Sequence, residues 1–215
     1  MNAPLDLVFV LVVLVDFFLL ASSRPKTGIR AVAAQGALLA LLPVMLASDG
    51  LHTGHVIALA AGALAVKAIA IPLLMGWATR EATPRREVAP FVGFASTLFL
   101  GALGAAAAFA FAGDLPLPVP GKHPMLVPTA VTTGWTGLLL LMTRRKAVTQ
   151  VLGFLVLENG VFVFGQLLSD FMPVMVEAGV LLDLLAATFV MGIVMFHINR
   201  EFSSLDTASL SALKD

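Results

Sequence analysis

Residues 143–165 read TRRKAVTQVLGFLVLENGVFVFG, and this stretch decides the fold. Three cations, Arg144, Arg145 and Lys146, precede a long apolar run that holds Glu158 and Asn159 near its middle. If the run crosses a bilayer as a helix, about ten residues at about 1.5 Å each put Glu158 close to the midplane. A carboxylate at that depth is costly unless it faces a bundle interior or a water-filled cavity. The run therefore predicts a transmembrane helix whose glutamate serves protons or ions.

The composition indicates a membrane protein. The chain has 215 residues, of which 59% are hydrophobic and 12% are charged, whereas about a quarter of the residues of a soluble domain are charged. We therefore expect an all-α fold, a polytopic bundle of transmembrane helices. Cysteine is absent, which excludes disulfides, thiolate zinc sites and cysteine-bound iron–sulfur clusters in this chain.

Catalytic and nucleic-acid-binding signatures are also missing from the sequence. It contains no Gly-rich phosphate loop, no zinc motif and no Ser–His–Asp order. We therefore expect no catalytic residue, metal site or cofactor site in this chain. The net charge is zero, which gives no sign of nucleic acid as a partner.

Seven apolar runs are long enough to cross a bilayer, each bounded by charge, Pro, Gly or Ser. Lysine and arginine gather in alternate loops and in the tail, and only Lys67 and Lys122 lie elsewhere. The positive-inside rule then puts the N-terminus outside and the C-terminus in the cytoplasm. The start, MNAPLDLVFV, lacks a positive n-region and a cleavage site, so it is interpreted as a first span. The runs cover approximately Leu5–Ala21, Ile29–Ala47, Gly54–Trp77, Pro90–Ala112, Met125–Met142, Val148–Leu168 and Pro173–Ile198.

A proline-rich loop, GDLPLPVPGKHP, divides the chain into two regions. Residues 1–112 are expected to form a four-helix transmembrane region, and residues 125–198 a three-helix region. Residues 199–215 then form a cytoplasmic tail.

A lysine lies deep in the third run. Lys67, within VKAIAIPLL, is more than two turns from either end of its run, roughly 15 Å from the interface, too far for its stem to reach the surface. Pro72 removes a backbone donor and leaves a carbonyl near Ala68 without its helical partner. A cation beside a broken helix is typical of an ion path, although a structural pair with a carboxylate is an alternative.

Acids on the last two runs form the other half of the candidate site. Glu158 and Asp183 are at similar depth when counted from the turn between their runs, and Glu177 is about a turn and a half higher. With Lys67 they place opposite charges at one level. This favours a proton relay over a neutralised structural cluster, because structural bundles rarely keep so many ionisable groups in lipid. His197 ends the last run at the cytoplasmic side, where helix capping is the favoured interpretation and proton entry the alternative.

Other polar and small residues are interpreted as structural. Asp6 and Asp16 are expected at the two interfaces of the first run, and Gln35, Gly36 and Pro43 to act as packing or kink features of the second. The fourth run carries small residues at i, i+4 spacing, which allow close helix approach. These pairs are Gly101/Ala105 and Gly104/Ala108.

The segments RRKAVTQVLGFLVLENGVF, VEAGVLLDLLAATFVMGIVMFHI, VKAIAIPLL and LDTASLSALKD resemble the hydrogenase-4 component E family. That family belongs to formate hydrogenlyase and related energy-converting hydrogenase complexes. The last three spans are also similar to the K subunit of respiratory complex I and to the C subunit of multisubunit Na+/H+ antiporters. In those relatives a glutamate follows a basic loop in the middle helix, as Glu158 does here, and Asp183 is the best match to their second acid, with Glu177 as the rival.

The resemblance implies a non-catalytic membrane subunit that contributes buried charges to proton or cation translocation. The nickel–iron centre and iron–sulfur clusters would belong to partner subunits. Expected partners are antiporter-like membrane subunits, a complex I-like membrane anchor and peripheral hydrogenase-like subunits, in a bacterial or archaeal cytoplasmic membrane. A subunit of a multisubunit cation/proton antiporter and a structural membrane scaffold are the alternatives.

Overall fold

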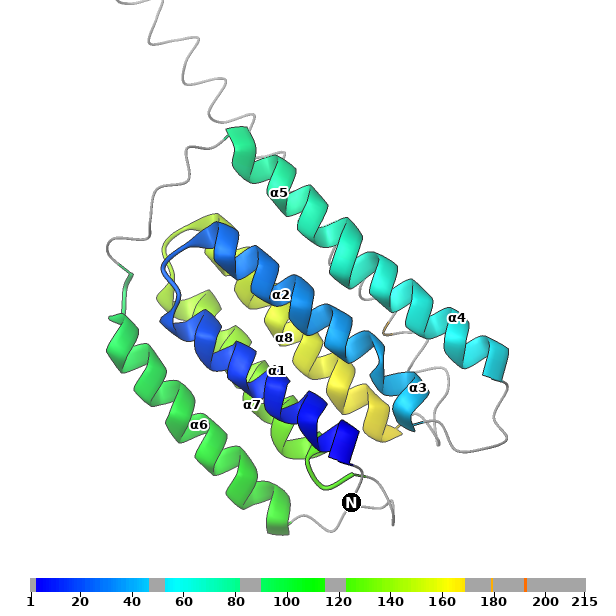
Figure 1. Cartoon of the computed structure of the whole chain (residues 1–215). Helices are drawn as coiled ribbons and strands as arrows, with labels where there is room; N and C mark the ends of the chain where they lie inside the picture. The colour runs from blue at the N-terminus through cyan, green and yellow to red at the C-terminus, as the bar shows by residue number, and fades with distance from the viewer. Residues whose placement is uncertain are drawn as a thin grey trace, which may run out of the picture.

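The computed structural model describes residues 3–46, 53–81, 90–114 and 123–168, together with the single residues 179 and 192. Within these ranges the chain is built from helices, without strands (Figure 1). Six helical segments of the described part are long and apolar enough to cross a membrane. They coincide with the first six predicted runs, whose helical nature is thereby confirmed. Apart from residues 179 and 192, the seventh run, 173–198, and the tail lie outside the described residues, so the span count and the domain division stay predictions.

Two of the six segments are interrupted helices. Helix α2 is separated from the short α3 by a turn at Leu41, as expected near Pro43, because a proline has no backbone N–H to continue the helical hydrogen bonds and its ring crowds the preceding turn. The third segment is α4, a π-helical stretch η1 and α5 in succession. The bounds are α1 Ala3–Ala21, α2 Pro25–Ala40, α3 Leu42–Leu46, α4 Thr53–Ala63, η1 Leu64–Ala70, α5 Ile71–Glu81, α6 Phe94–Asp114, α7 Leu126–Thr143 and α8 Ala147–Leu168.

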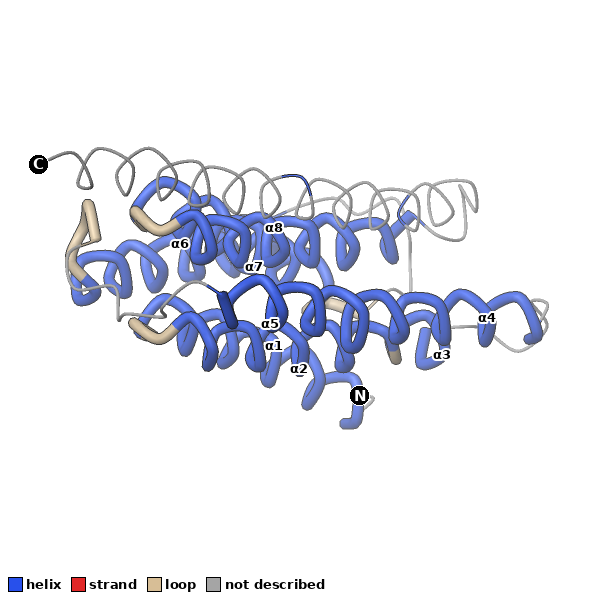
Figure 2. Tube along the Cα trace, turned by 90° about the horizontal axis from the view of Figure 1, so that it is seen from above, coloured by secondary structure: helices blue, strands red, loops and turns tan. Residues whose placement is uncertain are grey.

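The helices form two layers (Figure 2). One layer contains α1, α2 and the segment α4–η1–α5, and the other contains α6, α7 and α8. Helix α1 packs on α6 and α7, while α2 packs on α8. The hairpin of α7 and α8 therefore lies directly against the N-terminal helices.

Glycines bring α7 and α8 into backbone contact. A Cβ atom on Gly160 would lie 2.5 Å from the backbone nitrogen of Gly134, and one on Gly153 would lie 2.8 Å from that of Leu141. Gly137 likewise meets the backbone of Leu157. Such separations are possible only without side chains, which is the usual way for membrane helices to associate tightly.

Helix α6 uses its small residues as the sequence predicts. A Cβ on Gly101 would overlap the Leu20 side chain of α1, and one on Gly104 would overlap Trp135 of α7. The Trp135 indole donates to the Leu100 carbonyl over 3.0 Å. The small residues thus let two larger side chains pack close to the backbone of α6.

Two clusters of buried apolar side chains form the core. The arginine-end cluster lies toward the turns at residues 22–24 and 144–146, and the histidine-end cluster lies toward His123 and the start of α1. The arginine-end cluster comprises Leu19, Leu20, Ile29, Val32, Ile71, Met75, Leu139, Leu140, Val151, Leu152, Leu155 and Val156. The histidine-end cluster comprises Leu5, Val8, Phe9, Val12, Leu39, Leu42, Leu126, Ala130, Phe162 and Val163.

Candidate functional site: a buried polar layer

An ion pair lies in the middle of the bundle. The Nζ atom of Lys67, on η1, is 2.5 Å from Oε1 of Glu158 on α8, and both side chains are 3% exposed. Lys67 also donates to Oδ1 of Asn159 over 3.0 Å. Its ammonium group lies 5.1 Å from the centre of the Phe162 ring, within the range of a cation–π contact. Lys67 and Glu158 thus lie at one depth, as the sequence predicts, while the predicted proton relay stays a prediction.

A chain of hydrogen bonds extends from this pair to a second carboxyl group. Asn159 donates from Nδ2 to Oε1 of Gln35, on α2, over 3.2 Å. Gln35 donates in turn from Nε2 to Oδ1 of Asp16, on α1, over 2.8 Å. The Thr133 hydroxyl, on α7, donates to Oδ2 of Asp16 over 2.7 Å. We call these six residues the polar layer: Asp16, Gln35, Lys67, Thr133, Glu158 and Asn159.

The polar layer separates the two apolar clusters. On α1, Val12 of the histidine-end cluster and Leu19 of the arginine-end cluster lie on either side of Asp16. On α8, Val156 and Phe162 likewise lie on either side of Glu158 and Asn159. The same order holds on α2 and α7, so the hydrogen bonds run across the helices, between two apolar layers.

Two local features position Lys67. Pro72 lacks a backbone N–H, and its ring would crowd the carbonyl four residues before it in a regular α-helix. The backbone widens into the π-helix η1 over Leu64–Ala70, and π-helical turns are frequent at functional sites. On α2, Gly36 allows the close approach of this segment, because a Cβ there would be 2.8 Å from that of Lys67.

The structure corrects the interpretation of Asp16 and Gln35. Asp16 was expected at the membrane interface, but it is fully buried and belongs to the polar layer. Gln35 was interpreted as a packing feature, yet it bonds both to Asp16 and to Asn159. Thr133 carried no signal of its own in the sequence. The available signal was that α1, α2, η1 and α8 each carry a polar residue within an apolar helix.

The remaining sequence candidates lie elsewhere. Asp183, Glu177 and His197 fall outside the described residues, so their roles stay predictions. Asp6 lies near the start of α1, where Oδ1 is 3.2 Å from Nε2 of His123. This second acid–base pair marks the histidine end of the bundle and is separated from the polar layer by the histidine-end cluster.

A buried arginine closes the other end. Arg144, in the turn after α7, is fully buried, donates from Nη2 to the Leu20 carbonyl at the end of α1, and lies 4.3 Å from the centre of the Phe94 ring. A cation at a helix C-terminus satisfies a carbonyl that has no intrahelical partner. Arg144 thereby ties α1, α7 and the start of α6 together.

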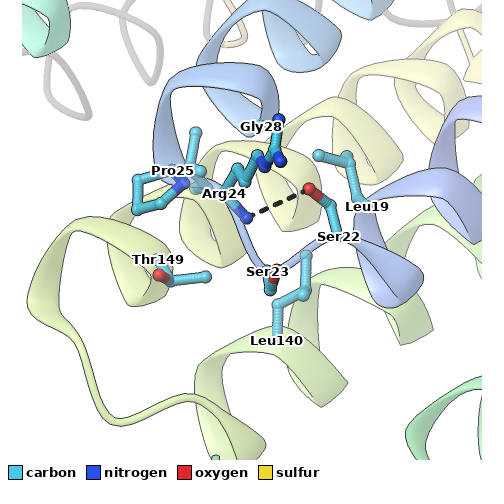
Figure 3. Close-up of a pocket in the computed structure, with 9 residues that line it drawn as sticks. Leu19, Ser22, Ser23, Arg24, Pro25, Gly28, Leu140 and Thr149 are labelled. Atoms are coloured by element: carbon cyan, nitrogen blue, oxygen red, sulfur yellow. Dashed lines mark hydrogen bonds between the residues drawn. The ribbon is translucent and has the colours of Figure 1, made fainter. Parts of the chain in front are cut away.

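The arginine end also carries a small hollow (Figure 3). Ser22, Ser23 and Arg24 of the α1–α2 turn line it, with Leu140 and Thr149 below them. The Arg24 backbone N–H donates to the Ser22 hydroxyl over 3.4 Å beside it. The space holds about one water molecule, so it is too small for a substrate.

Comparisons with known proteins connect the chain to a family. It is 34% identical over 190 residues to the uncharacterized protein Rv0085 of Mycobacterium tuberculosis, covering 87% of this chain and 85% of that protein. It is 31% identical over 157 residues to hydrogenase-4 component E of Escherichia coli K12, covering 72% of this chain and 71% of that protein. No model of a known protein family matches the chain, and no solved structure matches it.

The apolar helices and the buried polar layer define the class: a multi-helix membrane protein with charges held inside its bundle. The sequence identity to the Escherichia coli relative then gives the family within this class. The chain belongs to the hydrogenase-4 component E family. The resemblance of the last three spans to complex I and antiporter subunits is not tested by these matches and stays a prediction.

Proposed function

We propose that this chain is a non-catalytic membrane subunit of a hydrogenase-4-type, complex I-related oxidoreductase, and that its polar layer takes part in redox-coupled proton translocation. The observation that carries the proposal is the Lys67–Glu158 pair, a cation and a carboxylate in contact deep inside an apolar bundle. Ionisable groups at such a depth are expensive, and they commonly mark ion or proton routes. Family membership supports the hydrogenase-related setting.

The direction of transfer follows from the packing. The arginine-end and histidine-end clusters separate the polar layer from both ends of the bundle. Protons would therefore move along the layer, in the plane of the membrane, and exchange with neighbouring subunits. Antiporter-like membrane subunits are the proposed neighbours, and Asp183 and Glu177 are the proposed next acids along the route.

The proposed setting is a bacterial or archaeal cytoplasmic membrane. Arg24, Arg144 and Arg145 lie at the arginine end, and the positive-inside rule assigns an arginine-rich end to the cytoplasm. The N-terminus would therefore lie outside and the C-terminus in the cytoplasm. His197 would then take up protons from the cytoplasm. A nickel–iron centre and iron–sulfur clusters in peripheral subunits would supply the redox chemistry.

Purification of the tagged protein in mild detergent, with mass spectrometry of the bound proteins, tests the subunit role. The proposal predicts antiporter-like subunits together with a nickel–iron large subunit. Antiporter-like subunits alone would favour the cation/proton antiporter reading, and a chain that purifies alone would contradict both.

The same purification with Glu158→Gln distinguishes a proton-relay role of Glu158 from a role in assembly alone. Glutamine keeps the shape of the side chain and still offers an oxygen to Lys67, so the proposal predicts an unchanged set of bound subunits. Loss of those subunits would instead show that Glu158 serves assembly. Asp6→Asn is the matched control, because Asp6 is a partly exposed carboxyl outside the polar layer.

A further inference from the structure

We propose that Asp16 is a second proton-binding residue of this subunit, holding its proton while Lys67 and Glu158 are paired. The inference rests on the proposed function and deepens it, because it adds a residue of the first helix to the route. It stands on the contacts of Asp16, on the direction of the hydrogen-bond chain, and on the placing of the nearby charges.

The contacts of Asp16 come from neutral groups. Its carboxyl is fully buried, with Oδ1 2.8 Å from the Gln35 amide nitrogen and Oδ2 2.7 Å from the Thr133 hydroxyl. No lysine, arginine or histidine of the described residues lies within ion-pair distance of it. An ionised carboxylate buried without a cation is strongly disfavoured, and such a group binds a proton instead.

The chain of amides between the two acids has a fixed direction. A lysine ammonium can only donate, so the Asn159 oxygen must face Lys67 and the Asn159 nitrogen must face Gln35. The Gln35 oxygen then accepts, which leaves its nitrogen to donate to Asp16. The oriented amide dipoles thus connect Lys67 to Asp16. A change of charge at the ion pair therefore changes how strongly the Asp16 carboxyl binds its proton.

The Thr133 hydroxyl suits both protonation states of Asp16. A hydroxyl can donate or accept. It donates to the carboxylate when Asp16 is ionised and accepts from the carboxyl proton when Asp16 is neutral, after which its own proton can turn to a backbone carbonyl one turn earlier on α7. Asp16 can therefore gain and lose a proton without movement of the heavy atoms around it.

Few charged side chains of the described residues lie around Asp16. Lys67 and Glu158 act on it through the amide chain, from η1 and α8. Arg144 lies toward the end of α1, where it binds the Leu20 carbonyl and stacks on Phe94. Helix α6, which packs against α1, carries no ionisable residue between Phe94 and Ala112. The acids Asp16 and Glu158 thus outnumber the cation Lys67 in the polar layer, and one bound proton makes these three residues neutral together.

Infrared difference spectroscopy of the purified complex at neutral pH, without turnover, tests the inference. The spectrum of the native protein minus that of Asp16→Asn should contain the carbonyl band of one protonated carboxyl group per chain. Asp6→Asn is the control and should remove no such band. A native-minus-Asp16→Asn spectrum that contains a carboxylate signal in place of the protonated band would overturn the proposal.

A second variant keeps the test decisive if Asp16→Asn does not accumulate. Thr133→Val removes one hydrogen-bond partner and should shift the protonated band without abolishing it, whereas an unshifted spectrum would contradict the inference. A negative infrared result for Asp16 can be distinguished from a negative result for the proposed function. An ionised Asp16 leaves a transport role of Glu158 intact, and a Glu158→Gln variant that translocates protons normally would leave the infrared result for Asp16 unchanged.

Discussion

The ammonium group of Lys67 contacts two successive side chains of α8, Oε1 of Glu158 at 2.5 Å and Oδ1 of Asn159 at 3.0 Å. One residue of a π-helical segment thereby connects the third apolar segment to the helix that holds the central carboxylate. The contact joins residues 91 positions apart in sequence. It forms the cationic end of the polar layer.

We expect replacement of one residue of the ion pair to lower the stability more than replacement of both residues. Lys67→Met and Glu158→Met each remove one half of the ion pair and keep the other charge buried, at a cost of about 3–5 kcal/mol. The double variant should recover most of that stability, because two apolar groups of similar volume suit an apolar core. Thermal unfolding in detergent measures this cycle. A double variant less stable than either single variant would show that the pair is a net source of stability.

Gly36→Ala should disturb the polar layer from outside it. The new Cβ would be 2.8 Å from the Cβ of Lys67 and 3.3 Å from its carbonyl oxygen, so η1 must move away from α2. We expect a loss of about 1–3 kcal/mol from overpacking and slower proton transfer. Gly62→Ala on α4 is the control, since a Cβ there meets nothing within 4 Å. Equal effects of the two substitutions in unfolding and transport assays would refute the role of Gly36.

Gly160→Ala should loosen the α7–α8 hairpin. Its Cβ would lie 2.5 Å from the backbone nitrogen and 2.8 Å from the Cα of Gly134, and backbone atoms cannot rotate aside. The expected loss is at least about 1–3 kcal/mol. On the same helix, Gly165→Ala meets nothing within 4 Å and should be neutral or slightly stabilising. The yield of folded protein and its melting temperature report the difference; matching values would argue against tight packing at Gly160.

Arg144→Lys should destabilise the arginine end although it keeps the charge. The planar guanidinium both donates to the Leu20 carbonyl and stacks on Phe94, and an ammonium group cannot reproduce that geometry. We expect a loss of about 1–3 kcal/mol in unfolding experiments. Arg145→Lys is the matched control, because Arg145 is exposed and stacks on the Phe91 ring. If the two variants unfold alike, Arg144 has no special role.

The sequence could predict the helices because an apolar run of about twenty residues has few other structures open to it. It could also predict that Lys67 and Glu158 lie at one depth, since counting residues along a helix gives depth to about a turn. Both predictions depend on position along one axis. Neither needs knowledge of which helices are neighbours.

Asp16 shows where such counting fails. Its place near the end of an apolar run indicates an interface, yet Gln35 and Thr133 lie beside it and hold it in the polar layer. Partners far apart in sequence decide its environment, and depth alone cannot reveal them. The π-helix at Lys67 was missed for a related reason, because Pro72 predicts a broken helix but not the way in which the backbone accommodates it.

The most direct test of the account is proton uptake by sealed inverted membrane vesicles in which the assembled complex turns over its redox substrate, with native protein compared to Glu158→Gln. Redox turnover is recorded in the same sample, with Asp6→Asn as the control. The account predicts that Glu158→Gln assembles and retains redox activity, while proton uptake per electron falls at least about tenfold, the change that about 1.4 kcal/mol on a rate-limiting barrier produces. Native proton uptake by the assembled Glu158→Gln complex would contradict the claim that this carboxylate carries protons.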